Sequence, residues 1–382
     1  KANSVVGRPR EPDGMAMSLP SAELASQKLA TATALPAHFY SAGEMNTVDQ
    51  LAVFNRHWQY VCHKSQIADL GDFVVAVLGQ LPIILVHTEQ GIRGYHNVCR
   101  HRAGPIAQCS GKGAKQLRCR YHGWTYNLDG SLRTATEMKD VEDFDVSRIR
   151  LPELQVREFE GLVFAAVEDA PDFEQYVEGI AGRLAQSGYK LADLHFHQHL
   201  SYDIDCNWKT YVDNYLEGYH VPHVHPELNK LLDYRSYVTT TSQWHSMQFS
   251  PLESGDDLYG SGDALYYFLY PNTMLNILPG RLQTNRVLPL PNNRCRVEFD
   301  FFYTASLGEK DDARRVRDLE FSDVVQDEDI QICVDVQKGL NSGSYVAGRL
   351  NPLRENALHH FQELLRADYR RYNSSVGSNA IG

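Results

Sequence analysis

The sequence predicts an α+β protein: an N-terminal antiparallel β domain, then a larger domain whose antiparallel sheet is flanked by helices. From about residue 50 to 165, short β-branched runs alternate with turn signals, as in DFVVAVLGQLPIILVH (72–87). Aromatic strand-like runs return after residue 200. Two long segments with helical spacing follow them, at 313–340 and 354–372. Elements segregated in this way along the chain are typical of the α+β class.

The chain has 382 residues, which is enough for about two domains with a sizeable core. We expect an N-terminal arm and lead-in helix at 1–49 that pack on the larger domain. The β domain is expected at 50–168 and the larger domain at 169–382. No internal repeat or low-complexity tract interrupts this division.

Charge and cysteine content exclude several classes of partner. The formal net charge is −11 and no basic run stands out, which argues against a nucleic-acid partner. No uninterrupted apolar segment reaches the roughly 18 residues of a membrane span, so no membrane partner is expected. The seven cysteines are an odd number scattered along the chain, unlike a disulfide framework. A reducing, cytoplasmic location is therefore expected.

Local turn, helix and strand signals predict the remaining elements. Expected are a hairpin turn at Asp129-Gly130, helices at 170–186 and 207–220, strands at 264–272 and 295–305, and Asn351-Pro352 as cap and first-turn pair of the last helix.

A first metal motif lies in the β domain. Cys99-x-His101 and Cys119-x-x-His122 place two thiolates and two imidazoles on two short loops. Structural zinc is one interpretation of this ligand set. A [2Fe–2S] cluster with both cysteines on one iron and both histidines on the other is the second. Three details favour the cluster: the closer CxH spacing, one ligand of each kind per loop, and Gly123, where we expect the backbone to pass close to sulfur.

A second group of candidate ligands lies in DNYLEGYHVPHVHPEL (213–228). Glu217 and His220 are three residues apart, on one face of the expected helix. Asp213 and Glu217 are like charges at i,i+4, which costs about 0.2–0.5 kcal/mol unless a cation or proton compensates. Prolines at 222 and 226 disturb the helix, so a later histidine can turn back to the same point. His220, His223 and His225 are all candidates, and a solvated histidine cluster is the alternative.

The third ligand is expected on the long helix at 313–340. Its apolar stripe consists of Phe321, Val325, Cys333, Val336 and Leu340. Asp329 fills the gap in this stripe, and a buried carboxylate is costly unless it is paired with a cation. Asp327, Glu328 and Asp335 lie off the stripe and are interpreted as solvated. An arginine partner for Asp329 is the alternative to a metal, but two histidines and one carboxylate are the ligand set of Fe(II) oxygenases.

The loops CRHR (99–102) and CRYHGW (119–124) resemble those of Rieske non-haem iron oxygenases. Gly104 and Tyr121 stand where respiratory Rieske proteins carry extra cysteines, and Cys109 falls outside both loops.

The segment 207–228 is similar to the catalytic signature of the alpha subunits of the same family, and the resemblance spans about residues 38–370. It implies that His220 and His225, rather than His223, bind iron together with Asp329. It also implies that Glu217 bridges to a neighbouring subunit's cluster histidine, at the position of His122.

The resemblance implies a terminal oxygenase with a Rieske [2Fe–2S] cluster and a mononuclear Fe(II), which uses O2 to hydroxylate a small organic molecule. Glu217 and Asp213 are the candidate catalytic residues. No G-x-G-x-x-G follows a strand, so electrons are expected from a separate NAD(P)H-dependent flavin/iron–sulfur reductase. The family also implies a homotrimer.

The same segment looks most like that of choline and carnitine monooxygenases, which implies hydroxylation or N-demethylation of a quaternary ammonium compound. Such a cation calls for an aromatic cage, for which the candidates are Trp244, Phe249, Tyr266, Tyr267 and Tyr270. One alternative is an aromatic-acid ring-hydroxylating oxygenase that holds a carboxylate with Arg281 or Arg286. The other is a non-catalytic Rieske electron-transfer protein.

Overall fold

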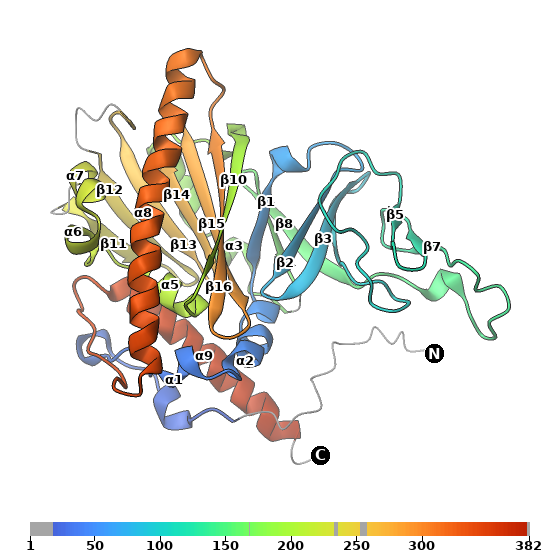
Figure 1. The fold of residues 1–382 in the computed structure, drawn as a ribbon, viewed down its shortest axis with the longest axis horizontal. Coiled ribbons are helices and arrows are strands. Elements are labelled where there is room, and N and C mark those ends of the chain that lie inside the picture. The colour runs from blue at the N-terminus through green and yellow to red at the C-terminus, as the bar shows by residue number, and fades with distance from the viewer. Residues whose placement is uncertain (1–17, 168, 233–235, 253–257, 380–382) are drawn as a thin grey trace.

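The structure is a computed structural model that describes residues 18–167, 169–232, 236–252 and 258–379. Two antiparallel sheets, one before residue 168 and one after it, lie side by side and pack through a shared core (Figure 1). This core contains Trp58 and Phe164 from the first sheet region and Leu265 and Tyr267 from the second. The α+β prediction is confirmed. Residues 1–17 of the expected arm lie outside the described residues.

The first sheet has six strands in the order β1-β9-β8-β4-β3-β2, and a separate three-stranded sheet, β5-β6-β7, follows its fourth strand in the chain. The run at 72–87 forms the β2–β3 hairpin, which turns at Gly79 with φ +57°. Gly130 has φ +82° between β6 and β7, as the Asp129-Gly130 turn predicted. The strands are β1 (Gln59–His63), β2 (Phe73–Leu78), β3 (Leu81–Thr88), β4 (Gly91–His96), β5 (Leu117–Arg118), β6 (Thr125–Tyr126), β7 (Leu132–Thr134), β8 (Glu153–Phe159) and β9 (Leu162–Ala166).

The second sheet has seven strands in the order β10-β16-β15-β14-β13-β12-β11. Its strands are β10 (His195–Ile204), β11 (Val238–Thr241), β12 (His245–Pro251), β13 (Asp263–Leu269), β14 (Thr273–Leu278), β15 (Arg281–Leu290) and β16 (Arg294–Tyr303). The expected strands at 264–272 and 295–305 correspond to β13 and β16. Nearly every residue of β14 and β15 is buried, because helices cover this sheet.

Helix α8 (Glu309–Asn341) crosses one face of the seven-stranded sheet, and α5 (Trp208–Tyr215) contacts both α8 and strands β15 and β16 (Figure 1). The other α-helices are α1 (His38–Ser41), α2 (Met45–Ala52), α3 (Phe173–Tyr176), α4 (Ile180–Gln186), α6 (Val221–Val224), α7 (Pro226–Leu231) and α9 (Asn356–Asn379). Among the described residues, none of the helices combines the length and the hydropathy that a membrane span needs.

Three helix predictions need correction. The helix expected at 170–186 is split into α3 and α4 at Gly179, whose φ of +78° ends the regular backbone. The helix expected at 207–220 ends at Tyr215, so Glu217 and His220 lie in the connection to α6 and not on one helix face. The last helix begins at Asn356, so Asn351-Pro352 precedes it by a turn instead of capping it.

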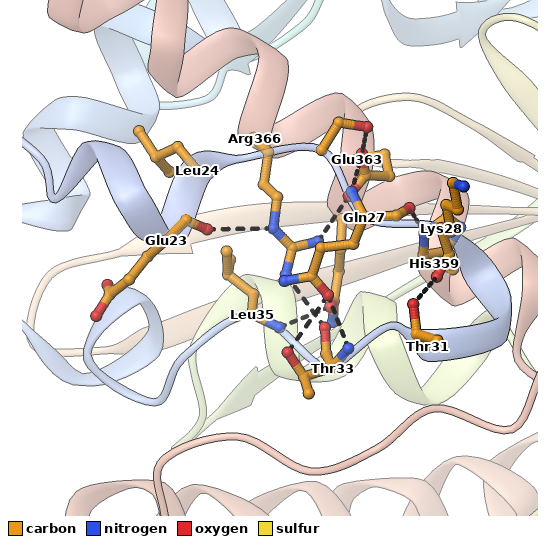
Figure 2. A network of polar contacts seen from close by, with 12 residues as sticks. Glu23, Leu24, Gln27, Lys28, Thr31, Thr33, Leu35, His359, Glu363 and Arg366 are labelled. Atoms are coloured by element: carbon orange, nitrogen blue, oxygen red, sulfur yellow. Dashed lines mark hydrogen bonds and ion pairs between the residues drawn. The ribbon is translucent and has the colours of Figure 1, made fainter.

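The N-terminal arm, residues 18–41, is bound along α9 by polar contacts (Figure 2). The fully buried Arg366 donates to the carbonyl oxygens of Glu23 and Thr33 and pairs with Glu363 at 2.9 Å. Leu35 N donates to Gln362 at 2.7 Å. Because these bonds satisfy arm backbone that has no sheet partner, the first and last described parts of the chain form one unit.

Candidate metal centres and substrate cavity

The two loops of the first motif have the same local design. In the first, Cys99 N donates to Gly104 O and Ala103 N donates to Cys99 O. In the second, Cys119 N donates to Trp124 O and Gly123 N donates to Cys119 O. Ala103 and Gly123 occupy equivalent positions, and both have positive φ, +59° and +75°. Each chain segment therefore turns tightly enough to present its cysteine and histidine on one side.

The four predicted cluster residues lie together at the tips of these loops. The rings of His101 and His122 have centroids 4.6 Å apart, and Cys99 and Cys119 are both buried. His101 stacks on Trp124 at 4.8 Å, and its Nδ1 is buried without a hydrogen-bond partner among the described residues. A buried nitrogen with a free lone pair, beside two thiols and a second imidazole, fits a Rieske cluster as ligand set.

Gly104, and not Gly123, is the glycine that lies against sulfur. A Cβ at Gly104 would lie 3.1 Å from Cys119 Sγ, whereas one at Gly123 would first meet Thr136. Gly123 is needed for its positive φ, so the predicted reason for this glycine was wrong. Cys109 is exposed and outside the group.

The second site brings together His220, His225 and Asp329. One ligand atom from each lies within 4.8 Å of the other two. Asp329 Oδ1 is 3.0 Å from His225 Nε2 and 3.8 Å from His220 Nε2. Asn214 Nδ2 also donates to Asp329 Oδ1 at 2.6 Å. His223 lies outside this group, and its side chain is exposed. Two imidazole nitrogens and a carboxylate facing one point are a ligand set that fits Fe(II).

Each of the two histidines is oriented by its own carboxylate. Glu217 Oε1 lies 2.7 Å from His220 Nδ1, and Glu328 Oε2 lies 2.7 Å from His225 Nδ1. When Nδ1 carries the proton, the lone pair on Nε2 points toward Asp329. Burial alone would lower the pKa of His225, but its bonds to Asp329 and Glu328 raise it.

Glu328 was predicted to be a solvated surface acid, and this prediction was wrong. The prediction assumed that the apolar stripe of α8 is its buried face, and Glu328 lies off that stripe. In the structure the buried face of the helix is mainly polar. That face carries Asp318, Ser322, Gln326 and Gln337, while Val336 is 46% exposed. A carboxylate next to a predicted iron ligand in sequence was the signal that could have identified it.

A cavity of about 950 Å³, part of it open to solvent, extends from the triad between α8 and the seven-stranded sheet. Strand β15 contributes Arg281, Gln283 and Asn285, alternate residues that face the same side. Seven aromatic side chains also line it: Tyr211, Tyr215, Tyr237, Tyr259, Tyr266, Phe299 and Phe321.

Of the five predicted cage residues, only Tyr266 lines this cavity. Tyr267 and Tyr270 are buried in the two core clusters, and Trp244 and Phe249 pack against those clusters. The aromatic residues of α5 and of the segment before β11 were missed, because sequence does not show which side of a strand or helix faces a cavity. Arg286 is also outside the cavity and pairs with Glu298 at 2.5 Å.

A second cavity of about 1150 Å³, part of it open to solvent, reaches the triad at His220. Asn214, Glu217 and His220 line both cavities, so they form the wall between them. Ala34, Leu35 and Tyr40 of the arm also line the second cavity. Glu217 can therefore be reached from a side that does not contain the substrate cavity.

Asp213 lines this second cavity and precedes Glu217 by four residues. Tyr40 OH donates to Asp213 Oδ2 at 2.6 Å, and Gln362 Nε2 donates at 3.3 Å, while Oδ1 is buried with no partner among the described residues. Burial raises the pKa of Asp213 to about 7, against the opposing effect of these hydrogen bonds and of Lys209. The structure gives it no contact with the triad, so it is not a ligand.

The two metal sites are far apart within the chain. Strands β5 and β7, which flank the cluster loops, lie at one end of the molecule, and α6 and α7 lie at the other (Figure 1). No contact between His122 and Glu217 is found in the part of the chain that the structure describes.

Comparisons with known proteins agree with these two sites. Residues 57–145 match the model of the Rieske [2Fe–2S] domain, and residues 191–370 match that of the ring hydroxylating alpha subunit (catalytic domain).

Among curated relatives, the chain is 39% identical to the chloroplastic choline monooxygenase of Arabidopsis thaliana, covering 88% of this chain and 83% of the relative. It is 27% identical to the carnitine monooxygenase oxygenase subunit of Escherichia coli K12, covering 87% and 92%.

Among solved structures, a quaternary ammonium Rieske monooxygenase in complex with L-carnitine has a TM-score of 0.80 at 26% identity, covering 92% of this chain and 99% of that one. Naphthalene 1,2-dioxygenase from Rhodococcus sp. shares the fold, with a TM-score of 0.72 at 20% identity over 88% of this chain and 94% of that one.

Proposed function

Because the chain belongs to the Rieske non-haem iron oxygenases, as a terminal oxygenase (alpha) subunit, we propose that it hydroxylates a small quaternary ammonium compound, with N-demethylation as one outcome. The single observation that carries this proposal is the convergence of His220, His225 and Asp329 on one point at the end of a cavity lined by aromatic side chains. Quaternary ammonium ions bind to such aromatic surfaces. The relatives named for choline and carnitine support the same class of substrate.

Cys99, His101, Cys119 and His122 would hold the cluster, and His220, His225 and Asp329 would hold the mononuclear iron. When bound, the cluster supplies single electrons and the iron supplies open positions for O2. Glu217 and Glu328 keep the Nδ1 protons of their histidines in place, so that both Nε2 atoms are available as ligands. The apolar and aromatic walls of the cavity exclude water from the bound substrate.

The distance between the two sites in one chain supports electron transfer between subunits. In the proposed homotrimer, Glu217 would bridge His220 and the partner subunit's His122. The second cavity offers the approach to Glu217 that this arrangement requires. A separate NAD(P)H-dependent flavin/iron–sulfur reductase would supply the electrons.

The proposal is tested by oxygen uptake with purified oxygenase, NADH and a surrogate reductase. Choline, betaines and carnitine would be compared with benzoate-like acids, and product would be measured by mass spectrometry. Substrate-dependent uptake that yields a hydroxylated or demethylated ammonium compound supports the proposal. Turnover restricted to aromatic acids would overturn it. Iron and sulfide analysis tests the mononuclear iron, which should add one iron to the two irons and two sulfides of the cluster.

Tyr126 should tune the cluster. Its hydroxyl lies 3.2 Å from Cys99 Sγ and accepts a hydrogen bond from Arg100 N at 3.0 Å, which leaves its own proton for the sulfur. A hydrogen bond to a charged group is worth about 1.5 kcal/mol, which corresponds to about 65 mV for a one-electron couple. Tyr126→Phe is therefore expected to lower the reduction potential by about that amount in a spectroelectrochemical titration. Tyr95 belongs to the same hydrophobic core as Tyr126. Tyr95→Phe is therefore the control, and it should leave the reduction potential of the iron–sulfur cluster unchanged.

Asp213 is proposed as a positioning residue that carries a proton near neutral pH. Since its pKa in the folded protein is raised from 3.8 to about 7, the folded state retains a proton that the unfolded state loses. Stability should therefore fall as pH rises from about 4 to 7 and stay lowered above that. Asp213→Asn is expected to remove this loss, so it should stabilise the protein more at pH 8 than at pH 5 in urea unfolding, with activity retained.

The exposed Asp205 provides the control, because Asp205→Asn should not change this pH dependence. An Asp213→Asn variant that keeps both metals but loses turnover would show that the ionised carboxylate itself is required.

A further inference from the structure

The two ends of the substrate cavity differ in charge. Glu217 and Asp329 line the end at the triad, and Arg281 lines the other region. Among the described residues, Arg281 is the one lysine or arginine that lines this cavity. Asp318, its ion-pair partner, and Asp329 are eleven positions apart on α8, which corresponds to about 16 Å along the helix. A purely cationic substrate would offer this guanidinium no acceptor.

Arg281 is held rigidly but not saturated. Its Nε donates to Asp318 at 2.8 Å and its Nη2 donates to Gln283 at 2.7 Å. A guanidinium has five N–H groups, so three remain, two of them on Nη1. Tyr303 is a further hydrogen-bond partner of the guanidinium. The other N–H groups belong to a side chain that is 6% exposed and lines the cavity. Because this guanidinium lines the cavity, its remaining N–H groups can donate to an acceptor on a bound ligand.

The negative charge of Asp318 is directed away from the cavity. Its carboxylate accepts from Arg281, from Tyr259 OH at 2.6 Å and from Tyr303 OH at 2.5 Å, and it does not line the cavity. Although burial alone would raise the pKa of Asp318, Arg281 and the two hydroxyls lower it, so the pair is ionised. The pair therefore fixes the guanidinium while its remaining N–H groups can receive a carboxylate in the forked geometry that arginine favours.

We propose that Arg281 binds the carboxylate of a zwitterionic substrate, so that this enzyme selects betaines over purely cationic compounds such as choline. The inference rests on the proposed function, because it assumes that the ammonium group is bound in the same cavity. It assigns Arg281 a different ligand from the aromatic acid considered as an alternative. Arg281 complements the carboxylate of a betaine, and the aromatic side chains that line the cavity complement its ammonium group.

The test measures equilibrium binding by calorimetry on the anaerobic, metal-loaded protein. The ligands are glycine betaine, γ-butyrobetaine and the methyl ester of each, which has the same ammonium group without the carboxylate. We expect at least one free betaine to bind about 30-fold more tightly than its ester, the ratio expected for one desolvated charge pair. If neither free betaine binds more tightly than its ester, the inference is overturned.

The variant Arg281→Gln/Asp318→Asn removes both charges together, because loss of Arg281 alone would leave a buried carboxylate unpaired. It should lose the preference for the free betaine while keeping the affinity for the ester. Arg286→Gln/Glu298→Gln is the matched control. It removes another arginine–carboxylate pair whose arginine is buried on β15, but this pair lies outside the cavity. This variant should keep the preference for the free betaine over its ester. Equal loss of affinity for acid and ester in the first variant would make Arg281 a structural residue and overturn the inference.

The two proposals fail differently. If the esters bind and support oxygen uptake while a carboxylate brings no gain, only the role of Arg281 is wrong. If none of the four ligands binds and no ammonium compound supports oxygen uptake, the proposed function itself is wrong, and the inference is overturned with it.

Discussion

Glu217→Gln is expected to keep both metals bound and to lower the turnover rate by more than about 100-fold, the upper end for a residue that only orients a metal ligand. Glutamine retains an oxygen that can accept from His220 Nδ1, where Glu217 now lies at 2.7 Å, so the histidine should stay in place. The variant loses the negative charge between the two cavities, which is where the proposed path from the partner subunit's His122 ends. Stopped-flow measurement of cluster reoxidation, with metal analysis, separates electron transfer from metal loss.

Glu328 provides a matched control for this experiment. It holds His225 Nδ1 at the same 2.7 Å, but it lines neither cavity. Glu328→Gln should therefore show only the effect of removing the negative charge next to His225. The cluster of this variant should reoxidise at nearly the normal rate. If the two variants slow reoxidation equally, Glu217 has no role beyond orienting His220.

Asp329→Ala is expected to remove the mononuclear iron and to leave the cluster intact, with a loss of turnover on the order of 1000-fold or more. Outer-shell partners cost about 10–100-fold when removed, and a ligand should exceed that range. Asp329 supplies the one carboxylate of the triad, so its removal leaves only the two histidines as ligands. Iron content should fall by one per chain, while the visible spectrum of the cluster should not change.

Asp327→Ala, on the exposed side of the same helix, is the control for nonspecific effects on α8. If Asp329→Ala retained the mononuclear iron, as a third iron beside the two of the cluster, Asp329 would not be its ligand. Addition of excess Fe(II) before the measurement excludes a simple weakening of affinity as the cause of lost turnover.

The sequence was sufficient where the chemistry depends on local structure. The cysteines and histidines of the first motif lie in loops closed by bonds within six residues, such as Cys99 N to Gly104 O, so spacing alone described their geometry. The structure also brings His220, His225 and Asp329 together. The residues alone left His220, His223 and His225 as candidates, and the resemblance to the family selected His225. The argument for Asp329 used an apolar stripe that includes Val336, which is 46% exposed. The helical argument for Glu217 and His220 was wrong, since both follow the end of α5.

The sequence was insufficient where function depends on which side chains line a cavity. Hydrophobic periodicity places apolar residues inward, but α8 turns Ser322 and Gln326 toward the substrate cavity and leaves Val336 exposed. For the same reason four of the five aromatic residues predicted for the cage are part of the packed core or its margins. Only the three-dimensional packing of α8 on the sheet distinguishes a core residue from a lining residue.

The N-terminal arm has a consequence for how the protein is made. Leu19 N donates to Asn373 Oδ1 at 2.9 Å across 354 positions of sequence. Gln362 of the same helix donates to Tyr40 OH and to Asp213, which are themselves hydrogen-bonded. During synthesis the arm leaves the ribosome well before its binding partner α9. The cluster domain can fold early, whereas the wall behind Glu217 is completed only after α9 has been made. A chain that lacks the arm or α9 should therefore carry a cluster and lack an efficient oxygenase site.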